Sequence, residues 1–237
     1  MITPTHKLAL LGIAAAWAFA APANAAPTLD QAHVPTVNLM SSDVGYFASP
    51  IPWVAQSFTV GRSGELSAVD VLVSKSTTSN DDEAVYGPLK VSLFGMSGGQ
   101  PSSALATTTI AAARIGYAPN EGAWLNIDFS SQHLQVGSGD QLAIVLHRLG
   151  TATAYDNDTY FGFSRPIRWF GSVFGDYAGG DAFTTPGDGT WNALSSGPTG
   201  MDFGFRTHVT PSVPEPQAWW MVVAGLGVAA AMRRRRR

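Results

Sequence analysis

Short segments in which apolar and polar side chains alternate run through the middle of this 237-residue chain. In the clearest segment, residues 123–129, Leu125 and Ile127 fall on one side and Asn126 and Asp128 on the other. A period of two places successive side chains on opposite faces of a β-strand. Clusters of Gly, Pro, Ser and Asp separate the segments, as is typical of strands joined by turns. The alternation therefore predicts an all-β fold.

The alternating segments number about ten. We expect strands at residues 53–60, 65–74, 89–94, 106–112, 123–129, 132–136, 141–147, 160–164, 181–185, 190–193 and 202–209. Residues 141–147 are apolar on both faces, which predicts a central strand covered on each side. The set predicts an antiparallel two-sheet sandwich with jelly-roll connectivity, and a closed barrel is the alternative. The sandwich should span residues 43–210, after a weakly patterned lead-in at residues 26–42.

The C-terminal 25 residues have three parts with different physical roles. A linker at residues 211–217 contains the tetrapeptide Val213, Pro214, Glu215 and Pro216. Its prolines keep the backbone extended, so that a processing enzyme could bind it as a strand-like peptide. The apolar run at residues 218–232 follows, and we expect it to form a transmembrane helix. The chain then ends with Arg233, Arg234, Arg235, Arg236 and Arg237, which should stay in the cytoplasm and fix the topology.

This tripartite tail resembles the PEP-CTERM sorting signal of Gram-negative bacteria. The resemblance implies handling by an exosortase, a membrane transpeptidase-like enzyme. The apolar run is only 15 residues long, whereas a stable helical span needs about 20. A short, Ala- and Gly-rich span suits a temporary anchor in the inner membrane. The alternative is a permanent anchor without processing.

The N-terminal 25 residues read as a secretory signal peptide with a signal helix. His6 and Lys7 form a modestly basic start, and residues 8–21 are apolar. Ala23 and Ala25 supply the small side chains that signal peptidase recognises, so cleavage is expected after Ala25. An uncleaved signal anchor is the alternative. Both ends of the chain thus predict export.

Charge and cysteine content exclude several classes of function for the region between the two signals. Of the 14 basic residues, Lys7 and the five terminal arginines lie outside residues 26–212, and of the 17 acidic residues only Glu215 does. This region therefore carries eight basic and 16 acidic residues, a net charge of −8. Such a domain is not expected to bind nucleic acid. The absence of cysteine excludes disulfides and thiolate sites.

The central region resembles the exported β-sandwich domains of the choice-of-anchor type, which precede varied surface anchors. The resembling stretches are residues 56–59 (QSFT), 91–94 (VSLF), 125–129 (LNIDF), 141–146 (QLAIVL) and 202–206 (DFGFR). They consist mostly of core patterning, so the resemblance implies a fold more than a function. By context it implies an association with extracellular polysaccharide and biofilm matrix.

Catalytic signatures are weak in this sequence. The five histidines include no closely spaced pair of the kind that holds zinc. Glycoside hydrolysis needs two opposed carboxylates, and Glu65, Glu83 and Glu121 all fall near turns. We expect no enzymatic activity and no required cofactor. A secreted carbohydrate-active enzyme that uses an Asp/Glu pair is the alternative.

An aromatic, Gly-rich stretch supplies the main candidate for ligand binding. Its rings could stack on sugar faces while charged groups bond the hydroxyls, and the candidate residues are Trp169, Tyr177, Trp191, Arg168 and Asp181. The competing interpretation is that these rings fill the core.

Calcium is a second candidate ligand. Asp156 and Asp158 place oxygen atoms at alternating positions of a predicted loop. The competing interpretation is that these side chains form turns.

These observations together predict an exported protein with a structural or adhesive role at the cell surface or in the extracellular matrix, with carbohydrate recognition as a candidate activity. Its expected partners are signal peptidase, an exosortase-like sorting enzyme, the inner membrane during transit, and polysaccharide.

Overall fold

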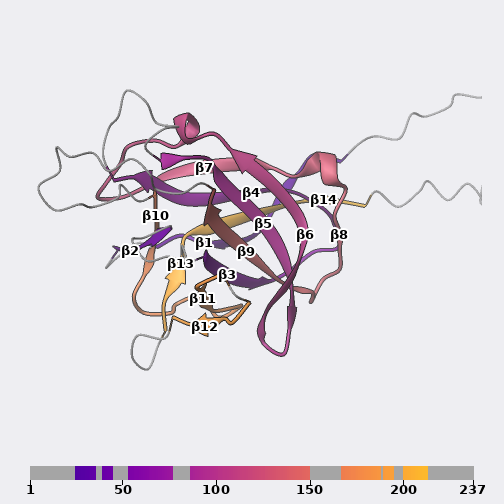
Figure 1. Cartoon of the computed structure of the whole chain (residues 1–237). Coiled ribbons are helices and arrows are strands. Elements are labelled where there is room, and N and C mark those ends of the chain that lie inside the picture. Colours follow the sequence, from indigo (N-terminus) through magenta and orange to yellow (C-terminus); the bar gives the residue numbers. More distant parts are fainter. Residues whose placement is uncertain are drawn as a thin grey trace, which may run out of the picture. The chain divides into compact units, whose positions relative to one another are not determined.

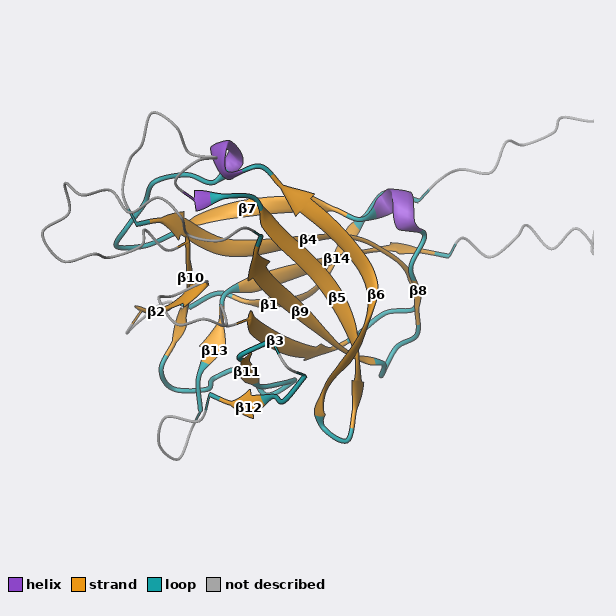
Figure 2. Ribbon diagram, viewed as in Figure 1, coloured by secondary structure: helices purple, strands orange, loops and turns teal. Residues whose placement is uncertain are grey.

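Two antiparallel β-sheets pack against each other in the computed structural model of this chain (Figure 1). The structure describes residues 25–35, 39–44, 53–76, 86–149, 167–187, 189–194 and 200–212. These residues belong to one compact unit, Ala25–Ser212. Most of them lie in strands, coloured orange in Figure 2.

The strands divide into an eight-stranded and a six-stranded sheet. The first contains β1 (Thr28–His33), β14 (Phe205–Pro211), β4 (Gly64–Lys75), β10 (Ile167–Ser172), β13 (Asp202–Phe203), β2 (Leu39–Val44), β7 (Ala123–Asp128) and β8 (Gln135–Val136). The second contains, in spatial order, β12 (Asn192–Ala193), β11 (Ala182–Thr185), β3 (Trp53–Thr59), β9 (Gln141–Arg148), β5 (Leu89–Ser97) and β6 (Gln100–Ile110). Two short 3₁₀ helices, η1 (Ala112–Arg114) and η2 (Ser130–Gln132), connect strands.

The expectation of an all-β fold with two antiparallel sheets is confirmed, and the described strands do not close into one barrel. The jelly-roll connectivity stays a prediction. The expected strand at residues 160–164, the signal helix at 1–25 apart from Ala25, and the helix at 218–232 lie outside the described residues. Within the described ranges, no helix has the length and apolar character needed to cross a membrane.

The segment that we treated as a lead-in, residues 26–42, contains strand β1 and the start of β2. Strand β1 pairs with β14, so that Thr28 lies opposite Val209 and His33 lies opposite Phe205. The sequence pattern did not predict this strand. Strand β1 is an edge strand with a bulge, and apolar and polar side chains need not alternate strictly in such a strand. Its pairing joins the first and last strands of the unit.

The main core lies between the two sheets and follows the predicted alternation. Val69 and Val71 of β4 are fully buried, and Ile127 of β7, opposite Val69, is buried with them. From the other sheet, Phe58 of β3 contacts Phe205 of β14 with ring centroids 5.7 Å apart. Because this unit has its own core and its terminal strands pair with each other, it contains what it needs to fold by itself.

A smaller apolar cluster covers the outer face of the six-stranded sheet. It consists of Ala55, Phe94, Ala143, Val145, Phe183 and Trp191, with Trp53 and Met96 packed against it. Strand β9 therefore contributes to both clusters, which confirms that it is a central strand covered on each side. At the margin of the cluster, Trp53 stacks on His147 with ring centroids 4.5 Å apart.

The hairpin of β5 and β6 turns over two residues, Gly98 and Gly99, with φ angles of 59° and 78°. Positive φ at both positions is typical of the type I′ turn, whose twist matches that of paired strands. The sequence pattern predicted strands at residues 89–94 and 106–112 with a longer connection between them. The tight turn instead lets both strands continue into that segment, so that Ser97 pairs with Gln100.

The stacked histidine gives a prediction for pH dependence. Burial, and secondarily the neighbouring Lys90, lower the pKa of His147 below its ordinary value of 6.5. The unfolded chain therefore binds a proton here more readily than the folded one, and stability is lost as the pH falls below about 6.5. His147→Phe keeps a stacking ring but cannot titrate. Urea unfolding of residues 26–212 should show wild-type stability falling relative to the variant between pH 7 and pH 5; a constant difference would contradict this.

Candidate functional site

The two tryptophans proposed for sugar stacking lie in different apolar clusters. Trp169 is fully buried in the main core, where it stacks on Phe203 with centroids 4.6 Å apart. Its indole N–H donates to the Gly204 carbonyl at 2.9 Å. Trp191 is 5% exposed and belongs to the cluster on the outer face of the six-stranded sheet.

The described rings therefore do not form a shared stacking surface, and the structure corrects our grouping of these residues. The physical reason is the alternation of β10, which turns Trp169 toward the other sheet, while Arg168 is partly exposed. Tyr177 is half-buried against the main core. Asp181 is exposed and comes together with Tyr177 in a pocket, described below.

Trp169→Ala should destabilise residues 26–212 by about 3–5 kcal/mol, because it removes a large buried ring and leaves a cavity. Phe174→Ala is the control, since Phe174 is 52% exposed and its loss should change stability by less than about 0.5 kcal/mol. Urea denaturation followed by tryptophan fluorescence measures both. Equal, small effects would show that Trp169 is not a core residue.

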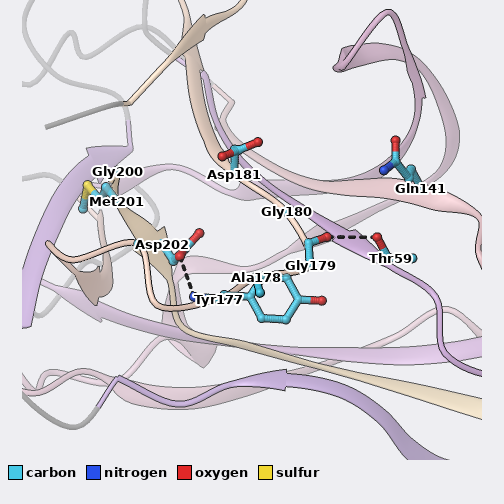
Figure 3. A pocket seen from close by; sticks show the side chains of 11 residues that line it. Thr59, Gln141, Tyr177, Ala178, Gly179, Gly180, Asp181, Gly200, Met201 and Asp202 are labelled. Carbon is cyan, nitrogen blue, oxygen red and sulfur yellow. Dashed lines mark hydrogen bonds between the residues drawn. The ribbon is translucent and has the colours of Figure 1, made fainter. Parts of the chain in front are cut away.

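A polar pocket of about 400 Å³ lies beside the Gly-rich loop at residues 175–181 (Figure 3). This volume falls within the range of small-ligand sites. The lining residues are Thr59, Gln141, Gly175, Tyr177, Ala178, Gly179, Gly180, Asp181, Gly200, Met201 and Asp202. The pocket thus gathers residues from the end of β3, the start of β9, the loop before β11 and the start of β13.

Close backbone contacts with β3 hold the loop in place. The Ser57 N–H donates to the Asp181 carbonyl at 2.9 Å, and the Asp181 N–H donates to the Ser57 hydroxyl at 2.8 Å. The Thr59 hydroxyl donates to the Gly179 carbonyl at 3.0 Å (Figure 3). A Cβ atom at Gly180 would lie 2.1 Å from the Ser57 carbonyl oxygen, so this approach requires glycine.

Asp202 anchors the same loop from inside the sandwich. Its side chain accepts hydrogen bonds from the Gln56 amide at 3.0 Å and from the Tyr177 N–H at 2.8 Å. Gln56 in turn accepts from the Phe203 N–H at 2.7 Å. Asp202 is only 2% exposed, and this burial raises the pKa of its carboxyl group above the ordinary value, while the two hydrogen bonds act in the opposite direction.

The groups that a ligand in the pocket could reach are polar and mostly uncharged. Asp181 and Gln141 are exposed, and their side chains lie on two sides of the pocket in Figure 3. Tyr177 packs edge-on against Phe205 with centroids 5.0 Å apart, and its hydroxyl donates to Gln31 at 3.3 Å. Burial raises the pKa of the Tyr177 hydroxyl, so it stays protonated at neutral pH. The arrangement can bind hydroxyl-rich ligands through donors and acceptors.

Sequence reasoning found Tyr177 and Asp181 but missed Gln56, Thr59, Gln141 and Asp202. They come from three strands that lie far apart in the chain, β3, β9 and β13, and no local spacing links these strands. One signal was present in the sequence. Gln56 shares a predicted strand face with apolar Val54 and Phe58, and a buried amide at such a position needs a hydrogen-bonding partner.

Within the described residues, one stretch matches the sequence pattern of a nucleophile elbow, the turn that presents a catalytic serine, but it does not form that turn. Residues 95–99 read Gly-Met-Ser-Gly-Gly, which fits the Gly-x-Ser-x-Gly pattern. Ser97, however, ends β5, and Gly98 and Gly99 form the hairpin turn to β6. An elbow requires a sharp turn from a strand into a helix, so this serine lacks the structural context.

Several predicted site residues fall outside the described part of the chain. Asp156 and Asp158, the calcium candidates, lie there, as do Ala23 and every residue of the Pro-Glu-Pro segment and the arginine tail. Ala25 is described and partly exposed. Within the described ranges, His, Asp and Glu side chains form no group of three that could hold a metal ion.

Asp202→Ala should release the loop at residues 175–181 and lower the stability of residues 26–212 by about 1–3 kcal/mol, because Tyr177 N–H and the Gln56 amide lose a buried acceptor. The matched control is Asp181→Ala, which removes an exposed carboxylate from the same pocket. Hydrogen exchange at the amide of Tyr177 should accelerate in the first variant only. Unchanged exchange in Asp202→Ala would show that the loop is held by other contacts.

Comparison with known proteins identifies a motif at the C-terminal end of the chain. No curated protein matches it. Residues 212–237 match a family model described as the PEP-CTERM protein-sorting motif. This match implies export, transient membrane anchoring and recognition by an exosortase-like sorting enzyme. The chain thus carries a PEP-CTERM sorting signal directly after its β-sandwich domain.

Proposed function

We propose that this chain is a non-enzymatic, exported β-sandwich protein that its C-terminal signal delivers to the cell surface or extracellular matrix of a Gram-negative bacterium. Its role there is structural or adhesive, and polysaccharide is its partner. The observation that carries the proposal is the sorting motif at residues 212–237, which begins one residue after β14 ends at Pro211.

Processing at the Pro-Glu-Pro segment is part of this proposal. The domain ends at the motif, so cleavage there would release the whole sandwich without cutting its last strand. The 15-residue apolar run is shorter than the roughly 20 residues of a stable span. Both observations support a temporary anchor over a permanent one.

Replacing Pro214 and Pro216 together by alanine in the full chain should block processing and leave the longer form in the membrane fraction. Pro211→Ala is the control, because it changes a nearby proline outside the tetrapeptide. Mass spectrometry of the product from a host with an exosortase gives the C-terminus of each form. A permanent anchor would be indicated if the wild-type chain also retained Arg237 at the membrane.

The pocket beside residues 175–181 is the proposed contact with polysaccharide. Exposed Asp181 and Gln141 offer an acceptor carboxylate and a donor–acceptor amide, the groups that bind sugar hydroxyls. The net charge of −8 on residues 26–212 favours a neutral glycan over an anionic one. The buried rings support the fold instead of stacking on the sugar.

A glycan array probed with residues 26–212 tests this contact, with and without a chelator that removes calcium. Binding to neutral glycans should weaken about tenfold in Asp181→Ala, since a hydrogen bond to a charged group is worth about 1.5–3 kcal/mol. Glu121→Ala, an exposed acid near a turn, should bind as the wild type does. No binding to any glycan, or equal binding by both variants, would remove polysaccharide from the proposal and leave the sorted scaffold.

A secreted carbohydrate-active enzyme is the second candidate, and one observation favours it. Asp181 and Asp202 line the same pocket, and the raised pKa of buried Asp202 is a property that a general acid needs. Release of reducing sugar from the glycans that bind, abolished by Asp181→Asn, would support this candidate. Binding without hydrolysis would favour the structural or adhesive role.

A further inference from the structure

The folded sandwich ends very close to the sorting tetrapeptide. Pro211, the last residue of β14, pairs with Gly64, the first residue of β4. A single residue, Ser212, separates this pairing from Val213, where the tetrapeptide begins. Two residues of fully extended chain span at most about 7 Å. An enzyme that binds the tetrapeptide must therefore work directly beside this end of the sandwich.

Two turns form the end of the sandwich beside Pro211. Gly64 pairs with Pro211 on one side and with Val136, the last residue of β8, on the other. The turn before β4 and the turn after β8 therefore flank the end of β14 (Figure 1). We call these two turns, residues 61–64 and 137–140, the terminal rim.

Hydrogen bonds join the two turns of the terminal rim. The Ser138 N–H donates to the Ser63 hydroxyl at 3.0 Å. The Val60 N–H donates to the Asp140 carbonyl, and the Gly139 N–H donates to the Val60 carbonyl, both at 2.8 Å. The rim is thus a preorganised surface, and a partner that binds it pays little for ordering these residues.

Arg62 gives the terminal rim its chemistry. The exposed side chains of the rim are Arg62, Ser63, Ser138 and Asp140. In the described part of the chain, the guanidinium of Arg62 has no hydrogen-bond or ion-pair partner. Arginine presents a rigid fork of N–H donors that fits a carboxylate, and it is enriched in protein interfaces. The rim therefore offers a free cation beside the tetrapeptide, on a domain that is otherwise acidic.

We propose that the terminal rim is a docking surface for the exosortase-like sorting enzyme, and that Arg62 bonds an acidic group of that enzyme beside its peptide-binding groove. This inference rests on the proposed processing at the Pro-Glu-Pro segment. Chain length identifies the occupant. The walls of a groove that pairs with an extended peptide lie about 5 Å from its backbone, so walls around Val213 reach the rim next to Pro211.

The membrane is the other surface that the tail brings near, and it fits the terminal rim less well. The apolar run begins at residue 218, seven residues after Pro211, and seven extended residues span up to about 24 Å. The net charge of −8 on residues 26–212 also opposes attraction to anionic lipid headgroups. The enzyme is thus the partner that must come closest to Arg62.

Arg62→Glu in the full chain tests the contact, in a host that has an exosortase. Losing a hydrogen bond to a charged group should slow processing about tenfold. Arg114→Glu is the matched control, because Arg114 is exposed and lies near the other end of β4, where the Lys75 N–H donates to the Gly116 carbonyl. It changes the net charge equally and should be processed as the wild type is. Pulse labelling with mass spectrometry of the C-terminus gives each rate, and circular dichroism of residues 26–212 verifies folding.

A flexible Gly/Ser segment of about ten residues, inserted after Ser212, separates docking from cleavage, because the tetrapeptide can then enter the groove without holding the rim beside it. The inserted chain should be processed more slowly than the wild type, and adding Arg62→Glu to it should change nothing further. Equal rates for Arg62→Glu and wild type, equal slowing by Arg114→Glu, or faster processing after the insertion would overturn the docking surface. A wild-type chain that retains Arg237 would refute processing itself, and this contact with it.

Discussion

The inner faces of the two sheets must cover each other, because both are apolar and neither can face water. Strand β4 is central to this requirement. It pairs with β14 and β10 along one edge and with β7 and β8 along the other, so that one 12-residue strand organises most of the eight-stranded sheet. Opposite it, β3 and β9 supply the covering face. Burial of this much apolar surface stabilises the domain without disulfides, in agreement with a chain that has no cysteine.

Within that apolar interior, a buried polar connection joins the two sheets. Gln56 from β3 bonds Asp202 from β13, and Asp202 also holds the Tyr177 N–H. Buried amide and carboxylate groups stabilise a fold only when their hydrogen bonds are satisfied. Here the hydrogen-bonded Asp202 also holds the loop that lines the pocket. The candidate binding site is therefore built on the same contact that joins β3 to β13, the strand before β14.

At two sheet edges, side chains bond backbone groups that a neighbouring strand would otherwise bond. Arg114 from η1 donates to the Asn126 carbonyl of β7 at 3.3 Å, and Gln132 from η2 binds both backbone groups of Thr107 in β6. Each of these two side chains comes from a short 3₁₀ helix. Helix η1 connects β6 to β7 in the other sheet, and η2 connects β7 to β8 within one sheet. Because an exposed edge strand can pair with other chains, such side-chain contacts protect the edges of the two sheets.

The sequence by itself determined the all-β class, the central strand β9, the apolar face of β7, and the sorting signal, because these depend on local alternation and composition. It did not determine β1, an irregular edge strand, or the burial of Trp169 in the core, because a large ring suits a core and a sugar site equally well. Only the tertiary structure brought Gln56 to Asp202 and Gln132 to Thr107. Such pairs are separated widely along the chain, and their meeting depends on the register and packing of strands that no single segment encodes.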